Sequence, residues 1–372
     1  MTLLSLLIQP ALACGGFAPQ EGALAASDAQ QALFDLGTHS ITVTYRAHYQ
    51  GNAADFAWVV AVPGGIGVVA EGDADKLDAI ALASAPQVEI DPASSEGSGC
   101  ACINSSYGLG DKGGGDNFGD TGVVVTGSGL AGNYTYTTLA ASDADGLVTW
   151  LTDHGYDVSL IEDAIAGYVA DPLDYEFVAV QLAPDAPETA ENGVDLAPLS
   201  ITYGIASDGA LHAIFPAKLG ASSSVEQVRT EIFVLGEGTA TLSGWEAVAN
   251  PDLTEGNTWD AVGADYWDPA GIYTHHLLGY GGAERRMWLA YAGSYDAGDG
   301  ARWLTRYDAI VFPSTNSVDP VFTDSTERTP ASTVIFLMNE TEYERDFPGD
   351  TAFMVVGLLG LLSWRRKARP QA

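Results

Sequence analysis

The chain has 372 residues and a formal charge of −34 at neutral pH, from 49 acidic and 15 basic residues. Because nucleic-acid binding depends on cations that neutralise phosphates, this charge argues against a nucleic-acid partner. Aromatic residues make up 10% of the chain, so its acidity is not that of a disordered acidic tail.

An apolar lead opens the chain and ends Ala11-Leu12-Ala13, directly before Cys14. Small residues at Ala11 and Ala13 fit the rule for signal peptidase, which predicts a signal peptide over residues 1–13 and an exported body. Two alternatives stay open, because the lead is short and no basic residue precedes its apolar core. One is a buried N-terminal strand. The other is lipidation of Cys14, which ranks lower because Ala11 replaces the usual leucine.

Two strands are predicted next. From Ser40 to Tyr49 apolar and polar residues alternate, which is typical of a half-buried strand. Gln50-Gly51-Asn52 predicts a turn, and Phe56 to Val62 follows as a more continuous apolar strand that ends at Pro63. We expect the two strands to form a hairpin-like unit at the core.

Helices are predicted over three segments. Asp73 to Ser84 places apolar residues at helical spacing. Ser142 is the expected N-cap of a second helix that Gly155 closes, and Ser159 to Glu162 has the form of a capping box that opens a third. Residues 97–122 are rich in glycine, serine and aspartate and predict a long surface loop.

The rest of the body has strand-like patterns. A helix pair among many strands predicts an α+β fold: mainly antiparallel β-sheet, sandwich-like, with a short helix pair and a C-terminal hydrophobic helix. Residues 14–346 form the exported body, and its length allows a subdivision near residue 135. The further strand-like segments are Tyr175–Leu182, Ser200–Ile205, Leu211–Phe215, Val228–Leu235, Met287–Ala292 and Thr333–Met338.

Residues 347–372 form a distinct tail. Thr351 to Trp364 is apolar and uncharged, and a cluster of basic residues from Arg365 to Arg369 follows. A helix over residues 351–364 reaches about 21 Å, short of a ~30 Å hydrocarbon core. The basic end fits the positive-inside rule, which predicts a membrane contact through residues 351–364, a cytoplasmic end, and a body in the periplasm or at the cell surface. An anchor and a cleaved sorting tail both fit, whereas a core helix leaves the cations unexplained.

The three cysteines are Cys14, Cys100 and Cys102. Disulfides persist in exported proteins, and an odd count leaves one cysteine over. Pairing Cys100 with Cys102 would strain the loop, so we expect a disulfide between Cys14 and either Cys100 or Cys102. Metal binding by the three cysteines ranks lower, because no histidine lies nearby.

Oxygen-bearing side chains gather among the glycines of residues 110–122. A pliable backbone that brings several oxygens together suits calcium, so this segment is the candidate metal site, although a solvated loop is the simpler interpretation. No other cofactor is expected. The candidate ligands are Asp111, Asp116, Asn117 and Asp120.

No catalytic residue is assigned, because the chain has no G-x-S-x-G nucleophile elbow, no phosphate loop and no H-E-x-x-H zinc motif. Four tryptophans lie in apolar patterns typical of a core: Trp58, Trp150, Trp288 and Trp303. The candidates for an exposed ligand surface lie instead in polar, turn-rich sequence: Trp245, Trp259 and Trp267.

Several stretches, in the same order, resemble the bacterial DUF2330 family: Cys14 to Phe17, Phe56 to Pro63, Trp150 to Tyr156, Phe177 to Val180, and Asp319 to Phe322. The resemblance spans roughly residues 14–325. Ala61, where the family usually has proline, and the long glycine-rich insert depart from the pattern. The resemblance implies an exported protein, and because the family has no assigned activity it names no catalytic residue.

These features together predict an exported, membrane-tethered bacterial envelope protein that binds or scaffolds a partner in the envelope. Two alternatives are an envelope hydrolase acting on glycan or peptide, and a calcium-stabilised surface module. A pocket that gathers a histidine or carboxylate pair would favour the hydrolase, whereas a flat aromatic face would favour binding.

Overall fold

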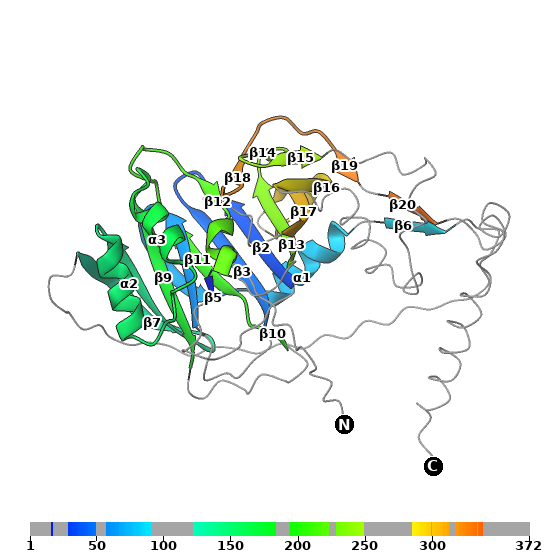
Figure 1. Cartoon of the computed structure of the whole chain (residues 1–372). Helices are drawn as coiled ribbons and strands as arrows, with labels where there is room; N and C mark the ends of the chain where they lie inside the picture. Colours follow the sequence, from blue (N-terminus) through cyan, green and yellow to red (C-terminus); the bar gives the residue numbers. More distant parts are fainter. Residues whose placement is uncertain are drawn as a thin grey trace, which may run out of the picture.

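The computed structural model of the protein describes residues 16–17, 29–49, 57–85, 87–90, 122–183, 194–222, 228–248, 285–298, 300–311, 317–332 and 334–337. Within this part of the chain two β-sheets stack face to face, and helices cover the outer face of each sheet (Figure 1). The layers are, in order, a helix pair, the smaller sheet, the larger sheet and a single helix.

The smaller sheet is antiparallel throughout. Its five strands lie in the order β1 (Gly16–Phe17), β4 (Ala57–Pro63), β9 (Tyr175–Leu182), β8 (Tyr134–Ala141) and β7 (Val123–Ala131).

The larger sheet has ten strands and mixes antiparallel pairs with two parallel ones, β2 with β13 and β15 with β16. Its main path runs β15 (Glu246–Val248), β16 (Arg286–Asp296), β17 (Ala301–Val311), β13 (Val228–Gly236), β2 (Ala29–Leu36), β3 (Ile41–Tyr49), β11 (Leu199–Tyr203) and β5 (Ile66–Glu71). Beside this path lie β10 (Val194–Asp195), paired with β3, and β19 (Ala331–Ser332), paired with β16.

Two small sheets complete the strands of the described residues. One is antiparallel and consists of β12 (Ala213–Ile214), β18 (Val321–Thr323) and β14 (Thr241–Ser243). The other pairs β20 (Val334–Leu337) with β6 (Gln87–Ile90) in parallel. The 3₁₀ helix η3 (Ala217–Ser222) lies between β12 and β13 in sequence.

The main core lies between the two sheets. On β3 the apolar residues of the alternating pattern, such as Val43 and Tyr45, are buried there, as predicted. On β4, Trp58 enters this core while Val59 points to the opposite face and is also buried. The whole of β4 is buried because helices cover the face of the smaller sheet that the larger sheet does not.

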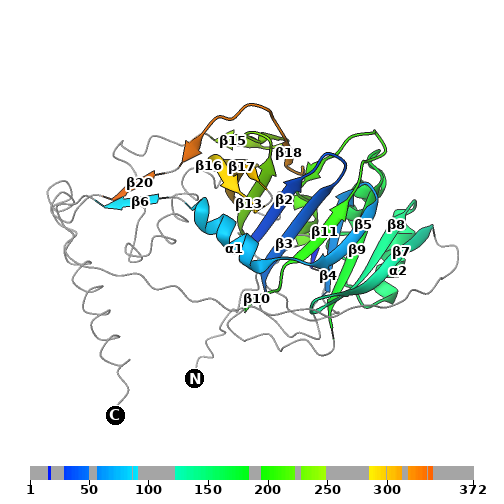
Figure 2. The ribbon, with the colours of Figure 1, turned by 180° about the vertical axis from the view of Figure 1, so that it is seen from behind.

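In the described residues, three α-helices cover the outer faces of the sheets, and Figure 2 shows α1 on the larger sheet. Helices α2 (Ala144–Asp153) and α3 (Glu162–Val169) pack on the smaller sheet through residues such as Leu151 and Ile165. Helix α1 (Ala74–Ala83) packs on the larger sheet, where Leu77 and Ile80 meet Phe233. The apolar spacing on each helix therefore marks the face that is buried.

The fold is α+β and mostly β, with antiparallel-rich sheets, as predicted from the sequence. The hairpin-like pairing of the first two predicted strands is wrong, because β3 pairs with β2 and β11, whereas β4 lies in the other sheet. Residue 135, near which a subdivision was considered, lies inside β8. None of the helices in the described residues has the length and apolar character needed to cross a bilayer. The predicted C-terminal helix lies outside the described residues.

Two predicted helix starts also need correction. The N-cap of α2 is Asp143, whose side chain accepts from the Gly146 N–H at 2.8 Å. Ser142 lies one residue before this position, and its hydroxyl donates to Gly122 O at 3.3 Å. Helix α3 has Ile161 at its N-cap and no side-chain cap. The predicted capping box is therefore absent, since the Ser159 N–H bonds back to Asp157 instead.

Candidate functional site

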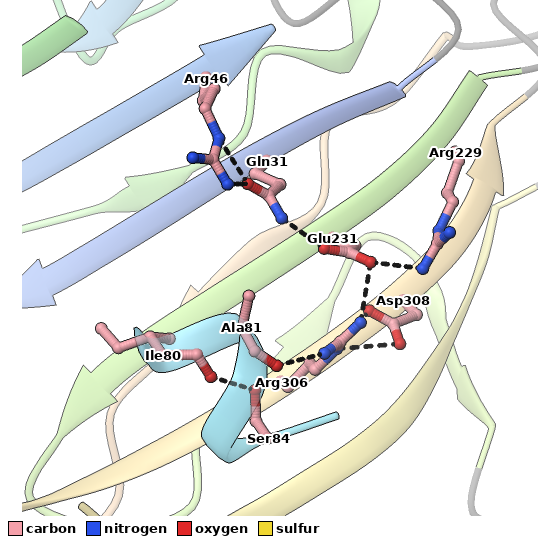
Figure 3. Close-up of polar contacts among 9 residues, drawn as sticks. All are labelled: Gln31, Arg46, Ile80, Ala81, Ser84, Arg229, Glu231, Arg306 and Asp308. Carbon is pink, nitrogen blue, oxygen red and sulfur yellow. Dashed lines mark hydrogen bonds and ion pairs between the residues drawn. The ribbon is translucent and has the colours of Figure 1, made fainter. Parts of the chain in front are cut away.

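A row of polar and charged side chains crosses the outer face of the larger sheet beneath α1 (Figure 3). The row joins four adjacent strands, β3, β2, β13 and β17. Because side chains alternate between the two faces of a strand, residues next to the sandwich core, such as Ile232, alternate with residues of this row, such as Glu231. The face opposite the core is thus polar along one line.

The row begins at the β3 end. Arg46 donates from Nη2 and Nε to Gln31 Oε1, at 2.6 and 2.9 Å. Gln31 in turn donates from Nε2 to Glu231 Oε2 at 2.6 Å. Arg46 also reaches α1, where its Nη2 lies 2.6 Å from Asp78 Oδ1. One amide side chain therefore relays between an arginine and a carboxylate that lie two strands apart.

Glu231 is the centre of the row. Its Oε1 accepts from Arg306 Nη2 at 2.8 Å and from Arg229 Nη2 at 2.7 Å. Arg306 also holds Asp308, with Nε 2.8 Å from Oδ1. Glu231, Arg306 and Asp308 are all buried. Charges in such a place are stable only when paired and hydrogen-bonded, as they are here.

The electrostatics of Glu231 follow from these contacts. Burial opposes the charged form of Glu231, but Arg306, Arg229 and the Gln31 hydrogen bond outweigh it and hold the pKa of Glu231 below its ordinary value. A general acid or base works best with a pKa near the operating pH. Glu231 is therefore an anion at neutral pH and is unsuited to proton transfer there.

Helix α1 closes the cluster from above. Its last turn holds no basic residue, so its C-terminal carbonyls depend on other partners. Arg306 donates from Nη1 to Ala81 O at 3.1 Å, and Ser84 donates from Oγ to Ile80 O at 2.7 Å. The buried guanidinium thus places a cation at the negative end of the helix, where it is favourable. Because the cluster joins four strands and α1, we interpret it as a structural cluster that holds the helix on the sheet.

The sequence signal for this cluster was present but incomplete. Arg306 and Asp308 lie in β17 at a spacing of two, which puts both on one face of the strand. Arg229 and Glu231 of β13 have the same spacing of two and precede an apolar run. Sequence reasoning missed the cluster because a sequence shows the charges of each strand but does not show which strands become neighbours. The pairing of β2 with β13 joins segments about 200 residues apart.

The sequence-predicted site residues fall into two groups. Trp245 is only 6% exposed, and its Nε1 donates to Val318 O at 2.7 Å, so its assignment to an exposed ligand surface is wrong. No group of three or more potential metal-ligating side chains occurs in the described residues. The other predicted site residues lie outside the described residues: Trp259, Trp267, Asp111, Asp116, Asn117, Asp120, Cys14, Cys100 and Cys102.

A second candidate site is the edge of the smaller sheet that is formed by strand β7. It ends the strand order of that sheet, and no other strand of the described residues pairs with its outer side. Val124 and Leu130 of β7 are 62% and 49% exposed. The edge strand of the larger sheet, β5, lies beside β7, and its Val68 is also exposed. Val124 and Leu130 lie on opposite faces of β7, because the register shift between Val125 and Gly127 separates them, so the edge exposes apolar side chains on both faces.

Comparisons with known proteins place the chain in a family. No curated protein matches it. The solved structure of baculovirus P35 is 10% identical, with 83% of this chain and 97% of that chain covered, at a TM-score of 0.34, which is too low to support any conclusion. A family model described as an uncharacterized protein conserved in bacteria (DUF2330) matches residues 9–300. This match confirms the resemblance seen in the sequence, and the chain belongs to the DUF2330 family.

Proposed function

We propose that this protein is an exported bacterial envelope protein that binds or scaffolds a partner and is held at the membrane by its C-terminal segment. The observation that carries the binding role is the uncharged edge of β7, which pairs with no further strand among the described residues and exposes Val124 and Leu130. Unpaired strand edges are templates for another chain, and native proteins usually blunt them. Retaining such an edge at the surface favours a role in recognition.

The location rests on the two ends of the sequence. The apolar lead before Cys14 supports export, and the apolar run of residues 351–364 with its basic end supports a membrane contact with a cytoplasmic end. The high acidic charge fits this location, because it keeps copies of a surface protein apart. The body would then fold in the periplasm or at the cell surface.

Fractionation of the native host with intact-mass measurement tests this proposal. We expect the protein in the membrane fraction, with residues 1–13 removed and a disulfide at Cys14 detected as a mass gain of about 2 Da on reduction. A chain shortened by deleting residues 351–372 should move to the soluble exported fraction. Recovery from the cytosol with Met1 retained would refute the export, and membrane retention of the shortened chain would refute the tether.

A further inference from the structure

We propose that β7 is a docking strand for an extended, basic peptide segment of another protein, which adds to the edge of the smaller sheet. This inference deepens the proposed function and rests on it, since it names the class of partner. Strand addition of this kind takes its affinity from main-chain hydrogen bonds and its specificity from side chains on the two faces.

The backbone of β7 is oriented for such an addition. The Ser142 N–H donates to Gly122 O at 2.9 Å, which fixes the first hydrogen-bonded pair between the segments leading into β7 and out of β8. Backbone groups alternate sides along a strand, so Gly122 and Val124 face β8. The N–H and C=O groups of Val123 and Val125 therefore point outward, at the free edge.

The edge of β7 lacks the usual protection against pairing. Its nine residues include no charged residue and no proline, and its irregularity is a single register shift between Val125 and Gly127. The neighbouring edge of β5 is different. There the Ile66 N–H, which would otherwise be open, donates to Glu176 Oε2 at 3.1 Å. A carboxylate thus caps one backbone amide of the β5 edge, whereas within the described part of the chain no further strand pairs with β7, and Glu176 meets β7 only at the Thr126 hydroxyl.

The charge around β7 selects a basic partner. Residues 122–183, which form β7, β8, β9, α2 and α3, contain nine acidic residues and no lysine or arginine. Asp143 lies beside Gly122 at one end of β7, and Glu71 lies beside Gly132 at the other end. The nine acidic residues are Asp143, Asp145, Asp153, Asp157, Glu162, Asp163, Asp171, Asp174 and Glu176.

An incoming segment with lysine or arginine meets acidic residues at both ends of β7, and the aliphatic stems of its basic residues can cover Val124 and Leu130. A second copy of the chain is a poorer occupant. It would bring its own charge of −34 and the same acidic residues to the same edge. Charge complementarity therefore favours a different protein with a basic, extended segment.

Binding of a fluorescent nine-residue peptide of alternating lysine and valine to the full chain tests the inference. We expect saturable binding that weakens as salt rises, and slower hydrogen exchange at the Val123 and Val125 amides in the complex. Two probes separate charge from backbone pairing: the same peptide N-methylated at every second residue, and a glutamate–valine peptide. Both should bind at least about tenfold more weakly. Equal binding of the N-methylated peptide, or protection confined to other strands, would overturn strand addition.

A matched pair of variants locates the site. Val124→Lys places a cation at the open edge, whereas Val68→Lys does so on the capped edge strand β5; both valines are exposed. We expect about tenfold weaker peptide binding for Val124→Lys and less than about twofold for Val68→Lys. Equal effects of the two variants would contradict the assignment to β7. A dimer in sedimentation that Val124→Lys dissolves would contradict the basic partner, because it would identify a second copy of the chain as the occupant of the edge. A chain that is exported but does not bind the peptide would refute this inference alone.

Discussion

The hydroxyl of Tyr168 on α3 donates a hydrogen bond of 2.8 Å to Oδ2 of Asp319, a buried carboxylate 151 residues further along the chain. Lys218 of η3 completes the contact: its backbone N–H donates to Asp319 Oδ1 at 2.9 Å, and its Nζ lies 3.1 Å from Oδ2. The three groups join α3, η3 and the segment before β18. Burial raises the pKa of Asp319 above its ordinary value even though Lys218 opposes it.

This raised pKa predicts a pH dependence of stability. A carboxyl whose pKa is higher in the folded state stabilises fully below its ordinary pKa of 3.8, and this contribution is lost as pH rises through the folded pKa. Asp319→Asn removes the titration. We expect the stability of the variant relative to wild type to increase between about pH 4 and pH 7, measured by urea unfolding at both values. A relative stability that stays constant or falls over that range would contradict the prediction.

The buried cluster beneath α1 predicts a large cost for losing its arginine. Arg306→Met leaves Glu231 and Asp308 buried without that cation, which costs about 3–5 kcal/mol of unfolding free energy. Arg286→Met is the matched control, because the ion pair of Arg286 with Glu246 is largely exposed and contributes about 0–1 kcal/mol. Urea unfolding of both variants at pH 7 measures the difference. Similar losses of unfolding free energy would show that the buried cluster stabilises the fold no more than an exposed ion pair does.

The pH dependence of the stability loss provides a second test of Arg306→Met. The pKa of Glu231 is lowered, so its contribution is present above its ordinary value of 4.5 and is lost as pH falls through the folded pKa. We therefore expect the gap between wild type and Arg306→Met to narrow as pH falls below 4.5. A gap that widens under acid would mean that Glu231 is not stabilised by Arg306.

The burial of individual strands could be predicted from the sequence, but their pairing could not. Alternation over Ile41–Tyr49 correctly indicated one buried face, and the continuous apolar pattern of the following strand correctly indicated deep burial. Yet Tyr45 and Trp58 meet as rings 6.1 Å apart across the core, one from each sheet. Every strand offers the same backbone hydrogen bonds, so the apolar pattern does not specify which strand becomes its neighbour.

The candidate sites show the same limit. Trp245 lies in polar, turn-rich sequence, which predicted exposure, but the Val318 carbonyl 73 residues away provides a partner for its indole N–H. The free edge of β7 depends on sheet order and has no local signal. Its valine-rich sequence with two glycines was not recognised as a strand. Features that depend on contacts between distant segments were therefore missed, whereas features with a local period were found.

The packing of α1 predicts different stability losses for substitutions at two of its leucines. Leu77 is fully buried against the larger sheet, whereas Leu82 is 80% exposed. Leu77→Ala should cost about 2–5 kcal/mol of unfolding free energy through lost burial and the cavity left behind. Leu82→Ala should change it by less than about 0.5 kcal/mol. Thermal and urea unfolding of both variants give the comparison, and an equal effect would show that α1 is not held by its apolar face.

A side chain at Gly64, in the turn between β4 and β5, is expected to clash with the backbone. Comparison with a second glycine separates this clash from the cost of a positive φ. Gly64 and Gly209 both have positive φ, at 93° and 83°, so alanine at either carries the left-handed penalty of about 1–2 kcal/mol. A Cβ at Gly64 would also lie 2.7 Å from Gly204 O, whereas a Cβ at Gly209 meets nothing within 4 Å.

Backbone atoms cannot swing away as a side chain does, so Gly64→Ala should cost a further ~1–3 kcal/mol beyond Gly209→Ala. Urea unfolding of the two variants under the same conditions measures that difference. If the two losses are equal, the close approach of Gly64 to the end of β11 does not constrain this turn.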